Sequence, residues 1–180
     1  PVIGCTCQAC TSNDLKDKRL RSSVLIEDAG LCFSIDAGPD FRQQMLRADI
    51  RKLDAVLLTH HHKDHMSGLD DVRAFNYLMK RPMKIYCQDR VIPEIKREFN
   101  YAFGEKRYPG VPDFDLRVIQ NKEFQIGHLN ILPIESTHYG IPIFGYRIGS
   151  LAYLTDVKYI SDDELSKLQG LDVLIINALR

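Results

Sequence analysis

Four of the chain's six histidines fall within six consecutive positions, in the segment LLTHHHKDHMSG at residues 57–68. The apolar run LDAVLLT before them, at residues 53–59, is typical of a buried strand. The pattern SGLDDVRAFNYLM after them, at residues 67–79, predicts a helix with Ser67 as its N-cap. A loop at the end of a strand is open to solvent but held by the sheet, which suits a functional site. We therefore expect the function of the chain to depend on this loop.

The spacing of the polar side chains in this loop favours metal binding. If the loop is extended, alternate residues share a face, so His60 and His62 point the same way and His61 points away. Asp64 and His65 lie at the junction with the predicted helix and could turn toward a second metal. Imidazole and carboxylate groups suit zinc, manganese or iron. The alternative is a solvated, histidine-rich turn that binds nothing.

The rest of the chain alternates predicted strands with amphipathic helices. A hairpin around Ala29-Gly30 is predicted within residues 22–36. Further strands are predicted at residues 83–88, 115–120, 129–136, 143–149 and 151–156, with a last buried strand at 171–178. Further helices are predicted at residues 38–46, 89–103 and 161–169. In the last of these, Ser161 and Glu164 have capping-box spacing. Hairpins and crossovers together indicate mixed sheets covered by helices, in a layered α/β domain.

Composition limits the class of protein. The 180 residues correspond to about one domain. Lys plus Arg number 24 and Asp plus Glu number 24, so the net charge of zero gives no overall electrostatic footprint for nucleic acid, although a local basic patch stays open. No apolar run approaches the roughly 18 residues of a membrane span. The odd count of five cysteines does not fit a disulfide framework, so we expect a reducing, cytoplasmic setting.

Four motifs together resemble the metallo-β-lactamase superfamily of hydrolases. SIDAGPD (34–40) resembles its strand-end aspartate motif, THHHKDH (59–65) its main metal loop, ESTHYG (135–140) its third motif and YLTDV (153–157) its fourth. The resemblance implies a four-layer αββα sandwich, in agreement with the predicted order of elements. Residues 1–12 and 138–157 look most like the branch of carbon–phosphorus lyase-associated phosphodiesterases and tRNA 3′-processing nucleases.

The resemblance implies a two-metal site. One metal would be held by His60, His62 and His138. The other would be held by Asp64 and His65, and Asp156 would bridge both. Asp64 and Asp156 would also be catalytic, because they fix the metals and orient the hydroxide shared between them. Asp36 would steady the metal loop by hydrogen bonds, with a simple strand-end turn as the alternative. His128 matches no motif and is predicted to be an exposed turn residue.

The cysteines divide into a cluster and two single residues. Cys5, Cys7 and Cys10, which we call the cysteine triplet, are close enough in sequence for one tetrahedral zinc with a fourth ligand from elsewhere. The resemblance implies a structural zinc at the triplet, and three reduced thiols in a flexible loop are the alternative. Cys32 and Cys87 lie in strand-like runs and are predicted to be small buried hydrophobic residues.

The sequence departs from the family at both ends. The family has a strand and a Gly-rich turn before PVIGC, and a further metal-binding histidine in a loop after the last strand. We therefore expect residues 1–180 to form one metallo-β-lactamase-like domain that is incomplete at both ends. The remaining ligand, and the acid that protonates the leaving group, are expected after Arg180.

The expected activity is metal-dependent hydrolysis of a small cyclic or nucleotide-like phosphodiester, with two divalent ions, zinc, manganese or iron. An RNA 3′-processing nuclease, a thioesterase and a lactamase are alternatives on the same fold. The chain lacks the long Gly/Lys-rich arm of an RNA enzyme, so nucleic acid is a weaker expectation than a small-molecule substrate. A flavodiiron-type oxidoreductase would have Glu in place of His62 and a flavin domain. A non-enzymatic, metal-stabilised module is the last alternative, and a homodimer stays open.

Overall fold

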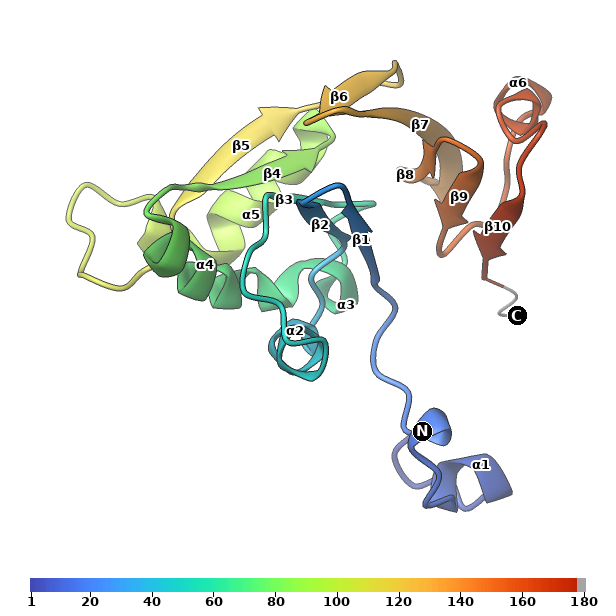
Figure 1. Ribbon diagram of the computed structural model, residues 1–180, viewed down its shortest axis with the longest axis horizontal. Helices are drawn as coiled ribbons and strands as arrows, with labels where there is room; N and C mark the ends of the chain where they lie inside the picture. The colour runs from blue at the N-terminus through green and yellow to red at the C-terminus, as the bar shows by residue number, and fades with distance from the viewer. Residues whose placement is uncertain (178–180) are drawn as a thin grey trace.

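Two five-stranded mixed sheets packed face to face form the centre of the protein in the computed structural model, which describes residues 1–177 (Figure 1). The first sheet has the order β1-β2-β3-β4-β5, with β1 Val24–Asp28, β2 Leu31–Ile35, β3 Ala55–Leu57, β4 Met83–Cys87 and β5 Phe114–Val118. The second has the order β10-β9-β8-β7-β6, with β6 Phe124–Ile126, β7 Leu129–His138, β8 Ile141–Ile148, β9 Leu151–Leu154 and β10 Val173–Ile176.

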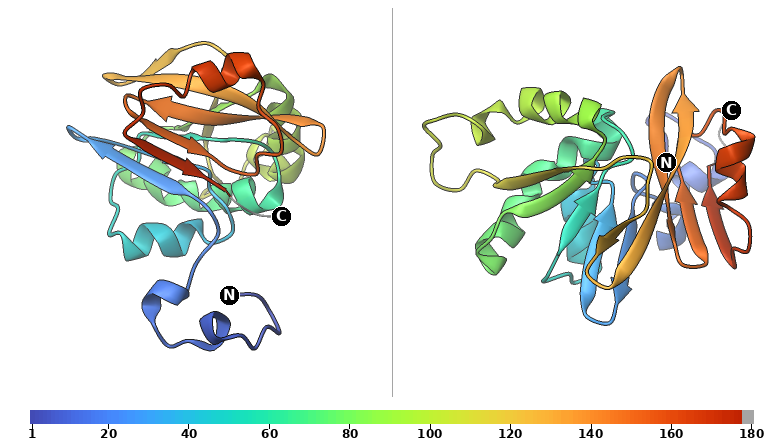
Figure 2. Two further views of the ribbon diagram at one scale, coloured as in Figure 1. Left: turned by 90° about the vertical axis from the view of Figure 1, so that its right-hand side faces the viewer. Right: turned by 90° about the horizontal axis from the view of Figure 1, so that it is seen from above.

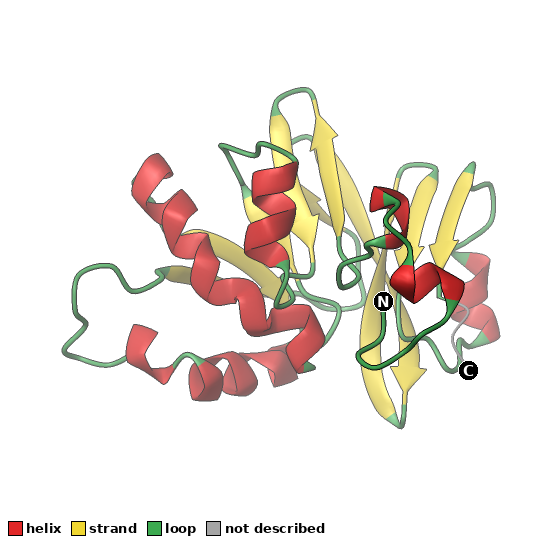
Figure 3. Cartoon of the chain, turned by 90° about the horizontal axis from the view of Figure 1, so that it is seen from below, coloured by secondary structure: helices red, strands yellow, loops and turns green. Residues whose placement is uncertain are grey.

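Helices cover both outer faces of the paired sheets (Figures 1 and 3). Four helices lie on the first sheet: α2 Phe41–Arg47, α3 Lys63–Met66, α4 Arg73–Met79 and α5 Ile92–Glu98. Helix α6 (Asp162–Ser166) lies on the second sheet, and α1 (Gln8–Thr11) belongs to an N-terminal segment that extends away from both (Figure 2). None of the helices described within residues 1–177 has the length and apolar character that crossing a membrane requires. The result is the four-layer αββα sandwich that the sequence predicts.

The core is divided between these layers by the alternation of side chains along the strands. In β3, Ala55 and Leu57 face the second sheet, whereas Val56 faces the helices. Tyr146 of β8 is fully buried in the layer between the sheets. Strands β2 to β5 run parallel, so their carboxyl ends meet at one edge of the first sheet. The chain that follows β2, β3 and β4 therefore starts at the same edge.

Most predicted elements are confirmed, including the β1–β2 hairpin and the burial of Cys32 and Cys87. Ser67 is not the N-cap of a long helix. It begins the 3₁₀ helix η2 (Ser67–Val72), and α4 starts only at Arg73. The tight 3₁₀ winding accompanies close packing at Gly68, where an added Cβ would lie 2.0 Å from a backbone oxygen.

Two further predictions need correction. Strand β10 is not buried: within residues 1–177 it pairs only with β9 at the edge of its sheet, and its four side chains are 41% to 47% exposed. Ala178, the last residue of that predicted strand, lies outside the described residues. Ser161 does cap α6 by accepting from the Glu164 N–H at 3.4 Å, but the Glu164 carboxylate binds Lys167 instead of completing the box.

Candidate metal centre

The histidine loop, residues 59–65, follows β3 and is held by both sheets. The Phe144 N–H of β8 donates to the Thr59 carbonyl at 3.0 Å. The buried Tyr146 hydroxyl donates to the Leu58 carbonyl at 2.6 Å. These bonds cross from the second sheet to the end of β3, so they fix the loop at the edge where the two sheets meet.

Three histidines converge at this edge. One ring nitrogen each of His60, His62 and His138 lies within 4.8 Å of the others, and we call this set the three-histidine group. His138 ends β7, just before a turn in which Tyr139 and Gly140 have φ of 48° and 79°. Both angles are left-handed, as a tight type I′ hairpin turn requires. The hairpin of the second sheet thus places His138 opposite the histidine loop of the first.

A second set of atoms adjoins the first. His60, His65 and Asp156 also offer ligand atoms within 4.8 Å of one another, and we call this set the aspartate group. Asp156 Oδ2 lies 2.6 Å from His65 Nε2 and 3.7 Å from His60 Nε2. Asp156 follows β9 and has a left-handed φ of 57°. Because His60 belongs to both groups, the two sets of donors are neighbours.

Asp36, directly after β2, lies behind the histidine loop and is fully buried. Its carboxylate accepts the Thr59 N–H at 2.8 Å and hydrogen-bonds His65 Nδ1 at 2.7 Å. It also accepts the Thr59 hydroxyl at 2.9 to 3.0 Å. The structure therefore gives Asp36 the hydrogen bonds to the loop that the sequence analysis expects, rather than those of a simple turn.

Thr59 sets the tautomer of His60. Its hydroxyl has one hydrogen, which goes to Asp36, so toward His60 Nδ1 at 2.9 Å the oxygen acts as acceptor. His60 Nδ1 then carries the proton, and Nε2 has a free lone pair. This Nε2 is buried and has no hydrogen-bond partner within residues 1–177. A buried nitrogen with a free lone pair, beside other imidazoles and a carboxylate, is what a divalent transition metal requires.

The electrostatics of the two groups differ. Burial, with the neighbouring histidines, lowers the pKa of His60 to about 2, so this ring is neutral. Burial and the nearby His138 also lower the pKa of His62. Burial opposes charge on His65, but hydrogen bonds to Asp156 and Asp36 outweigh it and raise the pKa to about 10. The two carboxylates thus favour positive charge at the aspartate group.

Asp64 and His61 lie at the margin of these groups. Asp64 is about half exposed, and its Oδ2 lies 3.7 Å from His65 Nε2, so it borders the aspartate group without belonging to it. His61 belongs to neither group among the described residues. His128 is exposed and pairs with Asp28 at 2.6 Å, away from the candidate centre, as predicted.

Two glycines that the sequence analysis did not single out hold the loop after β2 against α3. The Ala37 N–H donates to the His65 carbonyl at 2.8 Å, and the Gly68 N–H donates to the Ala37 carbonyl at 2.8 Å. A Cβ on Gly38 would lie 2.1 Å from the Asp64 carbonyl oxygen. Only glycine permits this approach, and the signal in the sequence is Gly38 within SIDAGPD together with Gly68 shortly after THHHKDH.

The cysteine triplet forms a separate cluster in the N-terminal segment. Its three sulfur atoms lie within 4.8 Å of one another. Hydrogen bonds from the Cys10 backbone N–H, and then from neighbouring thiols, lower the pKa of Cys7 to about 7. Three sulfurs at this spacing, one of them readily ionised, fit a tetrahedral zinc with a fourth ligand from elsewhere.

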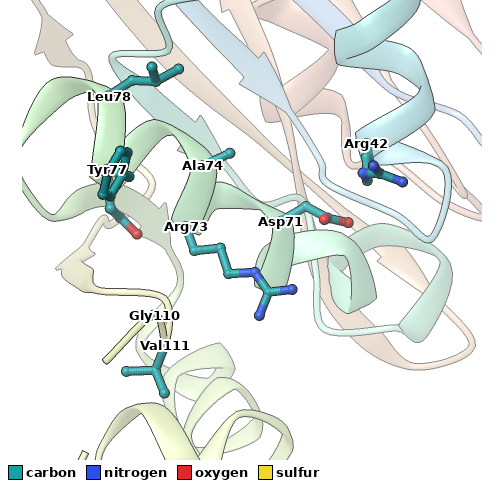
Figure 4. A pocket seen from close by; sticks show the side chains of 9 residues that line it. Arg42, Asp71, Arg73, Ala74, Tyr77, Leu78, Gly110 and Val111 are labelled. Atoms are coloured by element: carbon teal, nitrogen blue, oxygen red, sulfur yellow. The ribbon is translucent and has the colours of Figure 1, made fainter. Parts of the chain in front are cut away.

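A pocket of about 770 Å³ lies on the helical side of the first sheet (Figure 4). It is lined by residues of α2, η2 and α4 and by the loop before β5, among them Arg42, Arg73 and Tyr77. None of the predicted metal ligands lines it. The chemistry at the histidine loop and this surface hollow are therefore separate features.

Comparisons with known proteins agree with this geometry. Residues 33–180 match the family described as the Beta-lactamase superfamily domain. A crystal structure described as a new diphosphatase from the PhnP family is 37% identical, with a TM-score of 0.87, over 97% of this chain and 66% of that one. The likeness confirms the predicted metallo-β-lactamase-like fold.

Two curated relatives carry different names. An octanoyltransferase of Porphyromonas gingivalis is 44% identical over the whole chain but only 37% of its own length. A ribonuclease Z of Methanopyrus kandleri is 30% identical over 79% of this chain and 49% of its own length. The chain thus spans less than half the length of these two relatives.

Proposed function

Because the chain belongs to the β-lactamase superfamily, we propose that it is a metal-dependent hydrolase that cleaves phosphodiesters of small molecules. The observation that carries the proposal is the pair of ligand groups sharing His60 at the meeting edge of the two sheets. Two divalent ions held there would supply Lewis acidity and lower the pKa of a bound water toward about 7. Zinc and manganese suit these donors, with iron as a further option.

Each ligand has a structural reason for its proposed role. The three-histidine group would hold one ion, and Asp64 with His65 would hold the other. Asp156 would bridge them, since one of its oxygens already lies near both His60 and His65. Asp36 holds the Nδ1 proton of His65 by a direct hydrogen bond and that of His60 through Thr59. Both rings therefore present Nε2 to the centre. Asp64 and Asp156 are the residues we propose to orient the attacking water.

The proposed substrate class rests on the relatives. The diphosphatase and the ribonuclease Z are both named for reactions at phosphorus. The net charge of zero gives this chain no overall electrostatic attraction for a long polyanion, which favours a small molecule over RNA. An acyl substrate is the second candidate, because the octanoyltransferase matches the whole chain at 44% identity.

We also propose that the cysteine triplet holds a structural zinc. Thiolates of this kind persist in a reducing compartment such as the cytoplasm. The triplet lies in the N-terminal segment rather than at the histidine loop (Figure 2). Its zinc would therefore stabilise that segment rather than take part in hydrolysis.

The test combines metal analysis with a substrate panel. The protein, loaded with zinc or manganese, is assayed on an aryl phosphodiester, a phosphomonoester, an octanoyl thioester and a β-lactam. We expect the phosphodiester to be hydrolysed fastest, and His138→Ala to lose both activity and one bound ion. His128→Ala is the matched control, since its exposed ring pairs only with Asp28. Fastest hydrolysis of the thioester would favour the acyl candidate, and absence of bound metal would refute both.

A further inference from the structure

Arg90 presents a cationic guanidinium group at the same edge as the histidine loop. It lies in the 3₁₀ helix η3 (Asp89–Val91), which begins two residues after β4 ends. Strand β4 runs parallel to β3, with Tyr86 opposite Leu57. Arg90 therefore comes as many residues after the end of β4 as His60 comes after the end of β3. The two residues extend from neighbouring strand ends.

The Arg90 side chain is held by Gln88. Its Nε donates to Gln88 Oε1 at 2.8 Å, and Gln88 is only 7% exposed. Tyr86 packs in the layer between the sheets and Cys87 packs against the helices, so Gln88 faces the second sheet by alternation. Arg90 Nη2 is buried and finds no hydrogen-bond partner within residues 1–177. A guanidinium is always charged, so this unpaired donor is costly to the folded chain.

Glu135 of β7 connects this guanidinium to the candidate metal centre. It lies opposite Phe144 in the β7–β8 register, and the Phe144 ring is in the layer between the sheets, so Glu135 also faces the first sheet. Phe144 in turn donates its N–H to Thr59 at the start of the histidine loop. Strand β8 lies between Glu135 and Thr59, so at about 4.8 Å per strand Glu135 is two strand spacings, roughly 10 Å, from the start of the loop. Burial lowers the pKa of Arg90, and the attraction of Glu135 opposes this shift.

We propose that Arg90 binds an anionic oxygen next to the phosphoryl group held at the candidate metal centre. The substrate would then carry two adjacent phosphoryl groups, as a diphosphate does. This inference rests on the proposed function and narrows its substrate class. The planar guanidinium suits the role because it binds phosphate oxygens through two parallel hydrogen bonds. Glu135 attracts Arg90 but accepts no hydrogen bond from Nη2, so among residues 1–177 no protein group satisfies this donor.

The test measures binding of inorganic pyrophosphate and inorganic phosphate to the metal-loaded protein by titration calorimetry. The wild type should prefer pyrophosphate. Arg90→Gln should weaken pyrophosphate binding on the order of 10- to 100-fold and phosphate binding much less, because a charge-assisted pair is lost. The pyrophosphate affinity of Arg90→Lys should lie between those of the wild type and Arg90→Gln, since Lys keeps the charge but not the planar guanidinium. Arg42→Gln is the matched control, because Arg42 lines the separate pocket of Figure 4. This variant should bind pyrophosphate as tightly as the wild type does.

Glu135→Gln separates anion binding from a merely structural ion pair. If Arg90 binds the substrate, loss of the competing carboxylate should make pyrophosphate binding a few-fold tighter. If Arg90 only balances Glu135, this variant should melt earlier with no gain in affinity. Thermal denaturation of every variant identifies any that fails to fold, and Arg90→Lys and Glu135→Gln then carry the test.

Two outcomes overturn the inference. One is a wild type without preference for pyrophosphate, and the other is an Arg90→Gln protein that folds and keeps the preference. Either result would leave the proposed function intact if phosphodiesters are still hydrolysed. Conversely, Arg90-dependent binding of pyrophosphate without hydrolysis of any phosphate ester would refute the proposed function and leave an anion site at Arg90.

Discussion

Replacing Asp36 by Asn is a sharp test of how the candidate metal centre is held. Asp36 is fully buried and has a left-handed φ of 64°, a conformation that Asn tolerates as well as Asp. The change therefore keeps the backbone and the side-chain shape. It replaces one acceptor oxygen by an NH₂ group, in a site where the donors of Thr59 and His65 both point at the carboxylate.

The expected magnitude follows from these bonds. In the Asp36→Asn protein the new amide oxygen can accept from Thr59, but the new NH₂ group then meets the Nδ1 proton of His65. Leaving these donors unmatched costs about 1–3 kcal/mol, a large part of the roughly 5–15 kcal/mol by which domains are stable. Metal binding requires His65 to lose the Nε2 proton and to keep the Nδ1 proton, which Asp36 accepts in the wild type; in the variant the last proton is better placed on Nε2, 2.6 Å from Asp156. A protonated Nε2 cannot bind a metal, so affinity at the aspartate group should fall about 10- to 100-fold.

The assay is titration with zinc or manganese in metal buffers, together with urea denaturation of the metal-free protein. Asp28→Asn is the matched control, because Asp28 is exposed and pairs with the exposed His128. We expect Asp36→Asn, but not Asp28→Asn, to bind metal more weakly at one site and to have a lower free energy of unfolding. An Asp36→Asn protein with wild-type affinity at both sites and an unchanged free energy of unfolding would refute the role given to Asp36.

Three further predictions concern the loop, the triplet and the packing behind them. Asp64→Asn should fold but hydrolyse phosphodiesters on the order of 10²–10³-fold more slowly at saturating metal, whereas His61→Ala should leave the rate nearly unchanged. An equal loss of rate in both variants would contradict the assigned faces of the loop. Replacing all three cysteines of the triplet by Ser should remove one zinc and lower the melting temperature; unchanged metal content and melting would exclude a zinc there. Gly68→Ala should destabilise by about 1–3 kcal/mol in urea, because its Cβ would meet backbone 2.0 Å away, and Gly104→Ala, with nothing within 4 Å, is its control.

The parts of the fold that depend on local pattern could be predicted from the sequence. The hairpin around Ala29-Gly30, the buried strand before the histidines and the helix capped by Ser161 each depend on neighbouring residues in the chain. The spacing of His60 and His62 likewise placed both in one group because side chains alternate along an extended loop. The layered arrangement required the resemblance as well, since local patterns do not fix how two sheets pack.

Features that depend on contacts between distant segments could not be predicted. Thr59 looks like an ordinary strand-end residue, and its link to Asp36 appears only when β2 and β3 lie side by side. Arg90 becomes notable only through the β3–β4 register and the facing second sheet. Strand β10 has an apolar sequence typical of burial, but burial depends on what packs against it, and it lies at a sheet edge. Registers and neighbours of this kind are tertiary information.

Several features that destabilise the folded chain occur together at one edge of the sandwich. Asp36 and Asp156 both have left-handed backbone angles, which Asp adopts more readily than most residues other than glycine but still at a cost. His60 Nε2 and Arg90 Nη2 are both buried without hydrogen-bond partners within residues 1–177. Each feature has a local cost, and strain of this kind concentrates where a ligand is bound. A cation beside His60 and an anion beside Arg90 would offset the two unpaired groups at once. The edge is thus better matched to a metal-bound anionic substrate than to either the metal or the anion alone.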